Sequence, residues 1–310
     1  MLRLLLILGF FLAGELPLFC QSKKICITVD DLPVVNYGIE DHLYLKGTIT
    51  DLVHTANKYD VPMIGFVNEG KLYTNNQLDS FKVGLLTYWI QNGYELGNHT
   101  FSHMDYNAAT IETFTEDIVK GEMITKELMK TKNQSFMYFR HPYLHSGATK
   151  AKSDSLSIIL DSLHYIVSPV TIDNSDYIFA DAYHKAYLRK DKPAMKYIGK
   201  EYVMYMERVL LYSEALSENL LHKRIAQTLL IHASLLNADY LDELIVMYKR
   251  HQYTFVSQSE VLKDEIYSHP ILVYSKRGNS WLCRWADKET VDGLKLQEPE
   301  VSQKIIALTK

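Results

Sequence analysis

The sequence predicts an α/β fold built on a barrel of parallel strands. Short apolar runs alternate with stretches of helical periodicity, which is the pattern of repeated β/α units. Polar and ionisable side chains follow nearly every apolar run. In barrels of parallel strands this is the edge where active sites are built.

Seven apolar runs are expected to form the strands. They span Ile25–Val29, Met63–Val67, Tyr94–Leu96, Phe136–Phe139, Tyr165–Val170, Thr228–Ile231 and Tyr253–Val256. Between them, Phe81–Gln91 predicts a helix that Gly93 ends. A second helix is predicted over Ile111–Lys130, with Ile111, Phe114 and Ile118 on one face.

Two regions do not follow this alternation, so that the main domain is expected to span residues 22–266. Residues 183–223 are expected to form a helical insertion, either one outer helix or a helical pair. Residues 267–310 are expected to form a C-terminal extension. Its Trp281 and Trp285 would share one face of a helix. They either anchor the extension to the barrel or offer rings on which sugars stack.

Residues 1–21 have the features of an export signal. Arg3 supplies a positive start, and the apolar run Leu4–Ala13 is too short to span a bilayer. No later stretch is apolar enough to form a transmembrane segment, so we expect a periplasmic or extracellular protein. As an alternative to a freely released protein, Cys20 could carry a lipid anchor.

The composition is that of an ordinary globular protein. The 310 residues are 47% hydrophobic and 23% charged, with a formal net charge of -4. This balance argues against a nucleic-acid partner, which would require basic patches. Cys26 and Cys283 either remain separate, with Cys26 as a small core residue, or form a disulfide. The composition does not indicate an oligomeric state.

The residues at the strand ends include groups that can carry chemistry. In strand order they are Asp30 and Asp31, Asn68 and Glu69, Asn98 and His99, Arg140, Asp173, and His232. His99 and His103 are four residues apart, and on a helical turn this spacing would place both imidazoles on one face, as a metal ion requires.

The adjacent acids Asp30 and Asp31 can complete such a site. Two like charges at the end of an apolar strand repel each other unless a cation lies nearby. One acid can bind the metal while the other remains free to deprotonate water. Two histidines and one carboxylate also leave coordination positions open, which is typical of a catalytic metal site.

The motifs resemble those of the polysaccharide deacetylases, the NodB-homology domain of carbohydrate esterase family four. In order, the matching segments are Thr28-Val29-Asp30-Asp31, His99-Thr100-Phe101-Ser102-His103, Arg140-His141-Pro142-Tyr143, Asp173-Asn174-Ser175-Asp176-Tyr177 and Leu230-Ile231-His232. The resemblance covers roughly residues 23 to 265. It implies a distorted, incomplete (β/α) barrel of about seven parallel strands, with the helical insertion and the C-terminal extension added to it.

The resemblance also implies roles for the first residues of the site. Asp30 would be the catalytic base, and Asp31, His99 and His103 would bind one divalent metal ion. Arg140 would hold the base and keep its pKa low. Zinc suits this ligand set, and cobalt, nickel or manganese would also fit it.

The remaining roles concern the acetyl group and its leaving group. The backbone N–H of Tyr143 would stabilise the oxyanion. His232 would be the general acid, oriented and charged by Asp176. Leu230 would line the pocket for the acetyl methyl group.

Pro142 and Tyr177 are expected to contact the substrate. The family usually has tryptophan where this sequence has Tyr177, so the aromatic wall is smaller and carries a hydroxyl. His141 is expected to be a surface residue of a loop.

These inferences together predict a metal-dependent hydrolase that removes acetyl groups from a carbohydrate, first of all N-acetyl groups of an amino-sugar polymer or oligomer. An acetyl-xylan type of O-deacetylase and a small-molecule amidohydrolase are the alternatives on the same fold. A non-catalytic carbohydrate-binding protein is a third reading.

Overall fold

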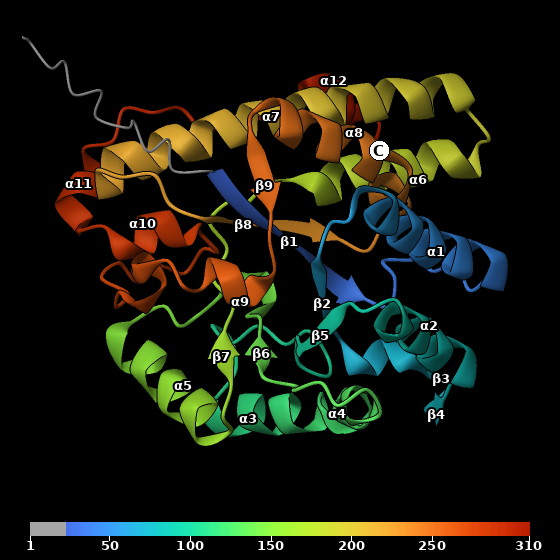
Figure 1. Ribbon diagram of the computed structural model, residues 1–310, viewed down its shortest axis with the longest axis horizontal. Helices are drawn as coiled ribbons and strands as arrows, with labels where there is room; N and C mark the ends of the chain where they lie inside the picture. Colours follow the sequence, from blue (N-terminus) through green and yellow to red (C-terminus); the bar gives the residue numbers. More distant parts are fainter. Residues whose placement is uncertain (1–22) are drawn as a thin grey trace, which may run out of the picture.

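The computed structural model describes residues 23–310, and its central feature is one sheet of seven strands (Figure 1). The strand order is β7-β6-β5-β2-β1-β8, and β9 pairs with β1 as well. Every pair in this sheet is parallel. The strands are β1 (Lys23–Leu32), β2 (Met63–Val67), β5 (Glu95–Asn98), β6 (Tyr138–Phe139), β7 (Ile166–Val167), β8 (Gln227–His232) and β9 (Tyr253–Phe255).

The sheet curls into a barrel that does not close fully. The segment after β7 meets β8 through a single bridge, between Ile172 and Leu229. On the other side of β1, β9 pairs with Lys23–Ile25, whereas β2 pairs from Ile27 onward. The prediction of a distorted, incomplete parallel barrel is therefore confirmed.

Helices surround the sheet, with α7 and α8 above it in the view of Figure 1, α1 and α2 to its right, and α3, α4 and α5 below it. The α-helices are α1 (His42–Tyr59), α2 (Ser80–Gln91), α3 (Ile111–Lys120), α4 (Met123–Lys130), α5 (Lys150–Ser162), α6 (Asp176–Leu188), α7 (Lys192–Leu221), α8 (Leu235–Arg250), α9 (Gln258–Val261), α10 (Trp281–Trp285), α11 (Lys288–Asp292) and α12 (Gln303–Ala307). The smaller elements are the hairpin of β3 (Tyr73–Thr74) and β4 (Gln77–Leu78), and the 3-10 turns Glu69–Leu72, Pro142–Leu144 and Glu265–Ser268.

The elements agree with the predicted order, with one clear exception. All seven predicted strands are present, and Gly93 follows α2 with a φ of 89°. The predicted helix Ile111–Lys130 is instead two helices that part at Gly121. A Cβ on Gly121 would lie 2.5 Å from the backbone of Thr100. A residue without a side chain is therefore required where this break between the helices packs against the loop that carries His99 and His103.

The insertion is a helical pair, and the extension is folded against it. The pair comprises α6 and α7, and α6 begins at Asp176, earlier than the sequence suggested. Trp281 and Trp285 are 2% and 4% exposed and share a core cluster with Leu216 and Leu220 of α7. Their burial anchors the extension and excludes the alternative that they offer rings to a sugar at the surface.

Three further expectations concern the cysteines, the membrane and the N-terminus. Cys26 and Cys283 are free in the part of the chain that the structure describes, so they form no disulfide with each other. Within residues 23–310 no helix has both the length and the apolar character needed to cross a bilayer. The predicted export signal, 1–21, and Cys20 lie outside the described residues.

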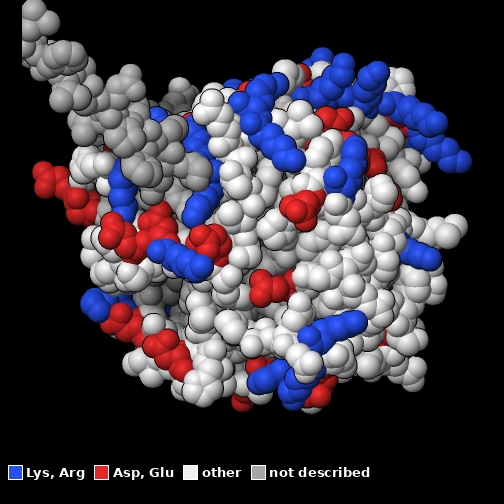
Figure 2. Space-filling model, in the orientation of Figure 1, with Lys and Arg blue, Asp and Glu red and all other residues white. Residues whose placement is uncertain are grey.

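Charged side chains of both signs share the face shown in Figure 2. Lys and Arg are most frequent along its upper edge, where Asp and Glu also occur, and its middle is largely uncharged.

Candidate active site

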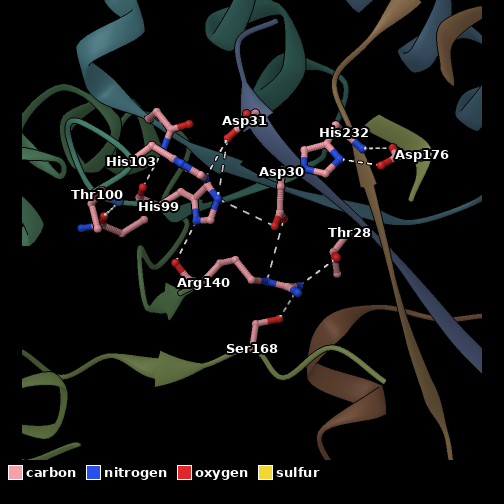
Figure 3. Close-up of polar contacts among 12 residues, drawn as sticks. Thr28, Asp30, Asp31, His99, Thr100, His103, Arg140, Ser168, Asp176 and His232 are labelled. Carbon is pink, nitrogen blue, oxygen red and sulfur yellow. Dashed lines mark hydrogen bonds and ion pairs between the residues drawn. The ribbon is translucent and has the colours of Figure 1, made fainter. Parts of the chain in front are cut away.

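A bulge in β1 brings Asp30 and Asp31 to the same site. Successive side chains of a regular strand point to opposite faces. Here the register against β2 shifts between Val29 and Leu32, and Asp31 has a φ of 68°. An extra residue of this kind breaks the alternation. Both carboxylates therefore lie beside His99, which is 3.8 Å from Asp30 and 3.7 Å from Asp31 (Figure 3).

His99 and His103 lie on a loop, so the expectation that a helical turn aligns them is wrong. Thr100 and His103 have φ values of 64° and 55°, which no α-helix contains. The side chain of Asn98 accepts the N–H of Thr100 at 2.7 Å, and Asn68 donates to the His99 carbonyl at 2.5 Å. These two amides, which the sequence analysis left without a role, hold the loop that brings the imidazoles together.

Asp31, His99 and His103 form a candidate metal-binding group, called the metal-binding group below. Their nearest ligand atoms lie within 4.8 Å of one another, and Asp31 Oδ1 is 3.6 Å from His103 Nε2. His99 donates its Nδ1–H to the Arg140 carbonyl at 2.8 Å, which leaves Nε2 free to bind a cation. Asp31 Oδ1 is buried and has no hydrogen-bond partner among the described residues. The three groups therefore fit a divalent cation.

The charges around this group suit metal binding. Burial lowers the pKa of His99 and of His103, so both imidazoles are neutral, as metal ligands must be. Burial would raise the pKa of Asp31, but Lys71 and His103 outweigh it and hold that pKa below its ordinary value. Lys71 Nζ is 3.3 Å from Asp31 Oδ2.

Asp30 is a buried carboxylate next to a buried guanidinium. Its exposure is 2%, and its Oδ1 lies 3.8 Å from Arg140 Nε. This contact is an ion pair without a hydrogen bond, and the guanidinium donates instead to Thr28 Oγ1 at 2.8 Å and to Ser168 Oγ at 3.2 Å. Burial raises the pKa of Asp30 to about 6, because it outweighs the opposing effect of Arg140. Arg140 lowers the pKa of Asp30, as expected, but the sequence analysis did not anticipate the larger, opposite effect of burial.

His232 ends β8 directly beside Asp30, with which it is in register. Its Nδ1 lies 2.7 Å from Asp176 Oδ1, and its backbone N–H donates to Asp176 Oδ2 at 2.8 Å. Burial by itself would lower the pKa of His232, but the carboxylate of Asp176 outweighs burial and raises the pKa to about 9. His232 is thus a protonated imidazole at neutral pH.

A further layer, which the sequence analysis missed, supports this pair. Asn237 in the first turn of α8 donates to Asp176 Oδ2 and to the His232 carbonyl, each at 2.8 Å. Tyr202 of α7 in turn donates to Asn237 Oδ1 at 2.6 Å. Nothing in the sequence separates these two residues from other helical polar residues, because only the packing of α6, α7 and α8 brings them together.

A cavity of about 480 Å³ opens over these groups. Its lining residues are Asp30, His99, His103, His141, Tyr143, Leu144, Asp173, Asn174, Ser175, Tyr177, Leu230, His232, Gly278 and Glu298. Tyr143 and Tyr177 are 55% and 57% exposed and form aromatic parts of its rim. Pro142 is buried and is not among the lining residues. Gly278 and Glu298 come from the C-terminal extension, to which the sequence analysis assigned no part in the site.

The structure corrects the prediction that His141 is a surface residue. Its exposure is 4%, and its ring stacks on Trp281 with centroids 5.8 Å apart. Burial lowers its pKa to about 3. His141 is therefore a neutral part of the contact between the barrel and the extension.

Comparisons with known proteins agree with this architecture. The sequence model of the family described as polysaccharide deacetylase matches residues 20–156. No curated protein sequence matches the chain. The match includes the metal-binding group, Asp30 and Arg140, while Asp176 and His232 lie beyond it.

Solved structures resemble the chain at low identity. The chitin deacetylase of Colletotrichum lindemuthianum is 18% identical with a TM-score of 0.51, over 79% of this chain and 89% of that one. The polysaccharide deacetylase Bc1974 of Bacillus cereus is 15% identical with a TM-score of 0.51, over 76% and 92%. A mutant of a carbohydrate esterase family four pseudoenzyme with restored enzymatic activity, from Bacillus anthracis, is 15% identical with a TM-score of 0.51, over 78% and 68%. At this identity the likeness establishes a shared fold.

Proposed function

We propose that the chain is a member of the polysaccharide deacetylase family, whose sequence model matches residues 20–156, and that it is a metal-dependent hydrolase that removes acetyl groups from a carbohydrate. One observation carries the proposal. A metal-binding group, a buried carboxylate with a pKa of about 6 and a protonated imidazole adjoin the same cavity. Metal-assisted hydrolysis of an acetamide uses these three functions together: a Lewis acid, a base for water and an acid for the leaving amine.

Asp31, His99 and His103 would hold the cation, and a bound cation supplies Lewis acidity toward water and the acetyl carbonyl. Zinc is the first metal to test for two histidines and one carboxylate, with cobalt, nickel and manganese as alternatives.

The chain's own residues would move the protons. Asp30 accepts the proton of the attacking water, and a pKa of about 6 leaves it ionised at neutral pH yet basic enough to act. His232 donates a proton to the leaving nitrogen, and Asp176 holds its ring by the bond to Nδ1. The backbone N–H of Tyr143 would donate to the oxyanion, and Leu230, a cavity-lining residue, would contact the acetyl methyl group.

The shape of the site supports a carbohydrate substrate. The cavity has exposed aromatic side chains, Tyr143 and Tyr177, on its rim, and amphipathic rings of this kind suit the faces of sugars. One structural neighbour is a chitin deacetylase. N-acetyl groups of an amino-sugar polymer or oligomer are therefore the first substrates to test.

Two alternatives are distinguished by substrate and by activity. An O-deacetylase or a small-molecule amidohydrolase would use the same residues on other leaving groups. The second alternative is a non-catalytic carbohydrate-binding protein, because one structural neighbour is a mutant of a pseudoenzyme. Acetate release from N-acetylglucosamine oligomers or peptidoglycan would support N-deacetylation, and release from acetylated xylan alone would support the O-deacetylase. A small-molecule amidohydrolase would release acetate only from small acetamides, and a non-catalytic protein would release none from any of these substrates.

The two adjacent acids provide the sharpest test of mechanism. Asp30→Asn should retain the metal, because Asp31, His99 and His103 remain, while turnover falls by about 10²- to 10⁴-fold as the base is lost. Asp31→Asn should weaken metal binding, and its activity should partly return at high metal concentration. Calorimetric metal titration and single-turnover acetate release measure both effects.

The same substitution at neighbouring positions makes each variant the control for the other. Loss of metal from Asp30→Asn with retention by Asp31→Asn would reverse the two roles. Unchanged metal affinity and turnover in both variants would place the active site elsewhere.

A further inference from the structure

The loop that follows Arg140 has an unfavourable backbone conformation. Tyr143 and Leu144 are consecutive non-glycine residues with φ values of 56° and 55°. Residues that have a Cβ disfavour this left-handed region, so two consecutive residues adopt it only where the surrounding structure holds them there. Both residues line the cavity, and the Tyr143 N–H is the proposed donor to the oxyanion.

Arg284, from α10 of the C-terminal extension, binds this loop directly. Its Nη2 donates to the Leu144 carbonyl and its Nη1 donates to Ser146 Oγ, each at 2.9 Å. Its exposure is 1%, and its guanidinium lies 5.0 Å from the ring centroid of Trp281. The planar guanidinium thus spans two acceptors of the loop in a fixed geometry.

Arg284 is a buried cation without a carboxylate partner. Its side-chain hydrogen bonds among residues 23–310 go to the Leu144 carbonyl, Ser146 Oγ and the Asn279 carbonyl, so none of these acceptors is a carboxylate. Burying a charge without a counter-ion is unfavourable. An apolar residue would serve packing better, so the hydrogen bonds to the loop are the feature that distinguishes arginine here.

Gly278, from the same extension, packs against the carbonyl of Tyr143, the residue before Leu144. A Cβ at this position would lie 2.0 Å from the Tyr143 carbonyl oxygen, so the extension backbone abuts the Tyr143 peptide. The extension itself is fixed to the barrel, because Trp281 N–H donates to the Val170 carbonyl at 2.8 Å and Ser280 Oγ donates to the Thr171 carbonyl at 2.7 Å. The carbonyls of Tyr143 and Leu144 therefore both meet one anchored segment.

We propose that Arg284 is a positioning residue of the active site, which together with Gly278 holds the Tyr143–Leu144 turn so that the Tyr143 N–H faces the developing oxyanion. The inference rests on the proposed function. Because the oxyanion exists only in the transition state and the intermediate, a displaced N–H should lower kcat and leave KM largely unchanged.

The test compares one substitution at two arginines of the extension. Arg284→Lys keeps the charge but replaces the planar fork by a single ammonium group, and kcat for acetate release should fall by about 10- to 100-fold, with KM within about threefold of wild type. Arg277→Lys is the matched control, since Arg277 is exposed, and it should behave as wild type. Gly278→Ala leaves Arg284 intact and should give the same selective loss of kcat.

Amide hydrogen exchange over residues 141–147 provides a readout that does not depend on activity. Exchange should accelerate in Arg284→Lys and in Gly278→Ala, and it should stay at the wild-type rate in Arg277→Lys. If Arg284→Lys does not fold, Gly278→Ala provides both readouts.

The outcomes separate this inference from the proposed function. A wild-type kcat in folded Arg284→Lys and Gly278→Ala overturns the positioning role even when acetate release is normal. A parallel loss of kcat and rise of KM, with unchanged exchange, also overturns it. A wild type that releases no acetate from any substrate defeats the proposed function, and the exchange rates then decide whether Arg284 holds the loop.

Discussion

Asp30 and Asp31 have identical side chains, yet their surroundings give them opposite properties. Burial next to Arg140 leaves Asp30 with a pKa raised to about 6, whereas Lys71 and the histidines lower the pKa of Asp31. A raised pKa suits a base and a lowered one suits a permanently anionic ligand. The bulge creates this difference, because it places the two carboxylates in separate surroundings within one site.

At the same scale, the pH dependence of activity should report the His232–Asp176 pair. The pKa of His232 is raised to about 9, so its acid form persists at neutral pH and is lost as pH rises through about 9. Asp176→Asn removes the anion that raises the pKa of His232, so that burial, which lowers this pKa, has more effect. The alkaline limb of kcat/KM should therefore move toward neutral pH by at least ~1 unit. Asp181→Asn, the same change at a partly exposed residue of α6 that pairs with Lys185, should leave the limb in place. An alkaline limb that stays near pH 9 in Asp176→Asn would remove His232 from the role of acid.

At the scale of elements, two additions to the barrel support opposite sides of the site. The pair α6 and α7 supports His232, the proposed acid: α6 begins with Asp176, and Tyr202 of α7 donates to Asn237. Another α7 residue, Tyr205, accepts the backbone N–H of Ser175 at 3.0 Å. The extension supports the opposite side through Arg284 and Gly278.

Removing one hydroxyl from α7 should test this support. Tyr202→Phe leaves Asn237 Oδ1 buried without its donor, and the free energy of unfolding should fall by ~1–3 kcal/mol. Turnover should fall several-fold as Asn237 loosens its hold on Asp176. Tyr248→Phe is the matched control, because the Tyr248 hydroxyl is buried without a partner among the described residues, so its removal should cost nothing. Urea denaturation and acetate release measure the two effects, and equal stability losses in the two variants would contradict the proposed support.

At the scale of the whole molecule, the barrel, the insertion and the extension share one apolar cluster. Its members include Val170, Leu216, Leu220, Leu230, Trp281, Leu282 and Trp285. Leu230 belongs to this cluster and also lines the active-site cavity. The extension therefore contributes to the apolar core that underlies the candidate active site.

Truncating one ring in this cluster should destabilise the whole fold. Trp281→Ala should lower the free energy of unfolding by ~3–5 kcal/mol, because it removes a buried indole and leaves a cavity. Leu272→Ala, at a position of the extension that is 51% exposed, should change it by less than ~0.5 kcal/mol. Chemical denaturation of both variants measures the difference. Similar losses in both would mean that the extension contributes no specific core.

The sequence by itself determined the strands and the residues that follow them. Apolar runs and their alternation with helices are local patterns, and parallel strands bring their carboxyl ends to one edge. For this reason Asp30, His99, Arg140 and His232 could be placed at one site before any contact was known.

Only the tertiary structure decided how those residues are oriented and charged. The bulge at Asp31, the non-helical loop of His99 and the burial of His141 depend on neighbours distant in sequence. So do the net pKa of Asp30 and the contacts of Asn237 and Arg284, which lie on other elements. Hydrogen bonding and desolvation depend on groups that only folding brings together. The local periodicity of the sequence therefore does not predict them.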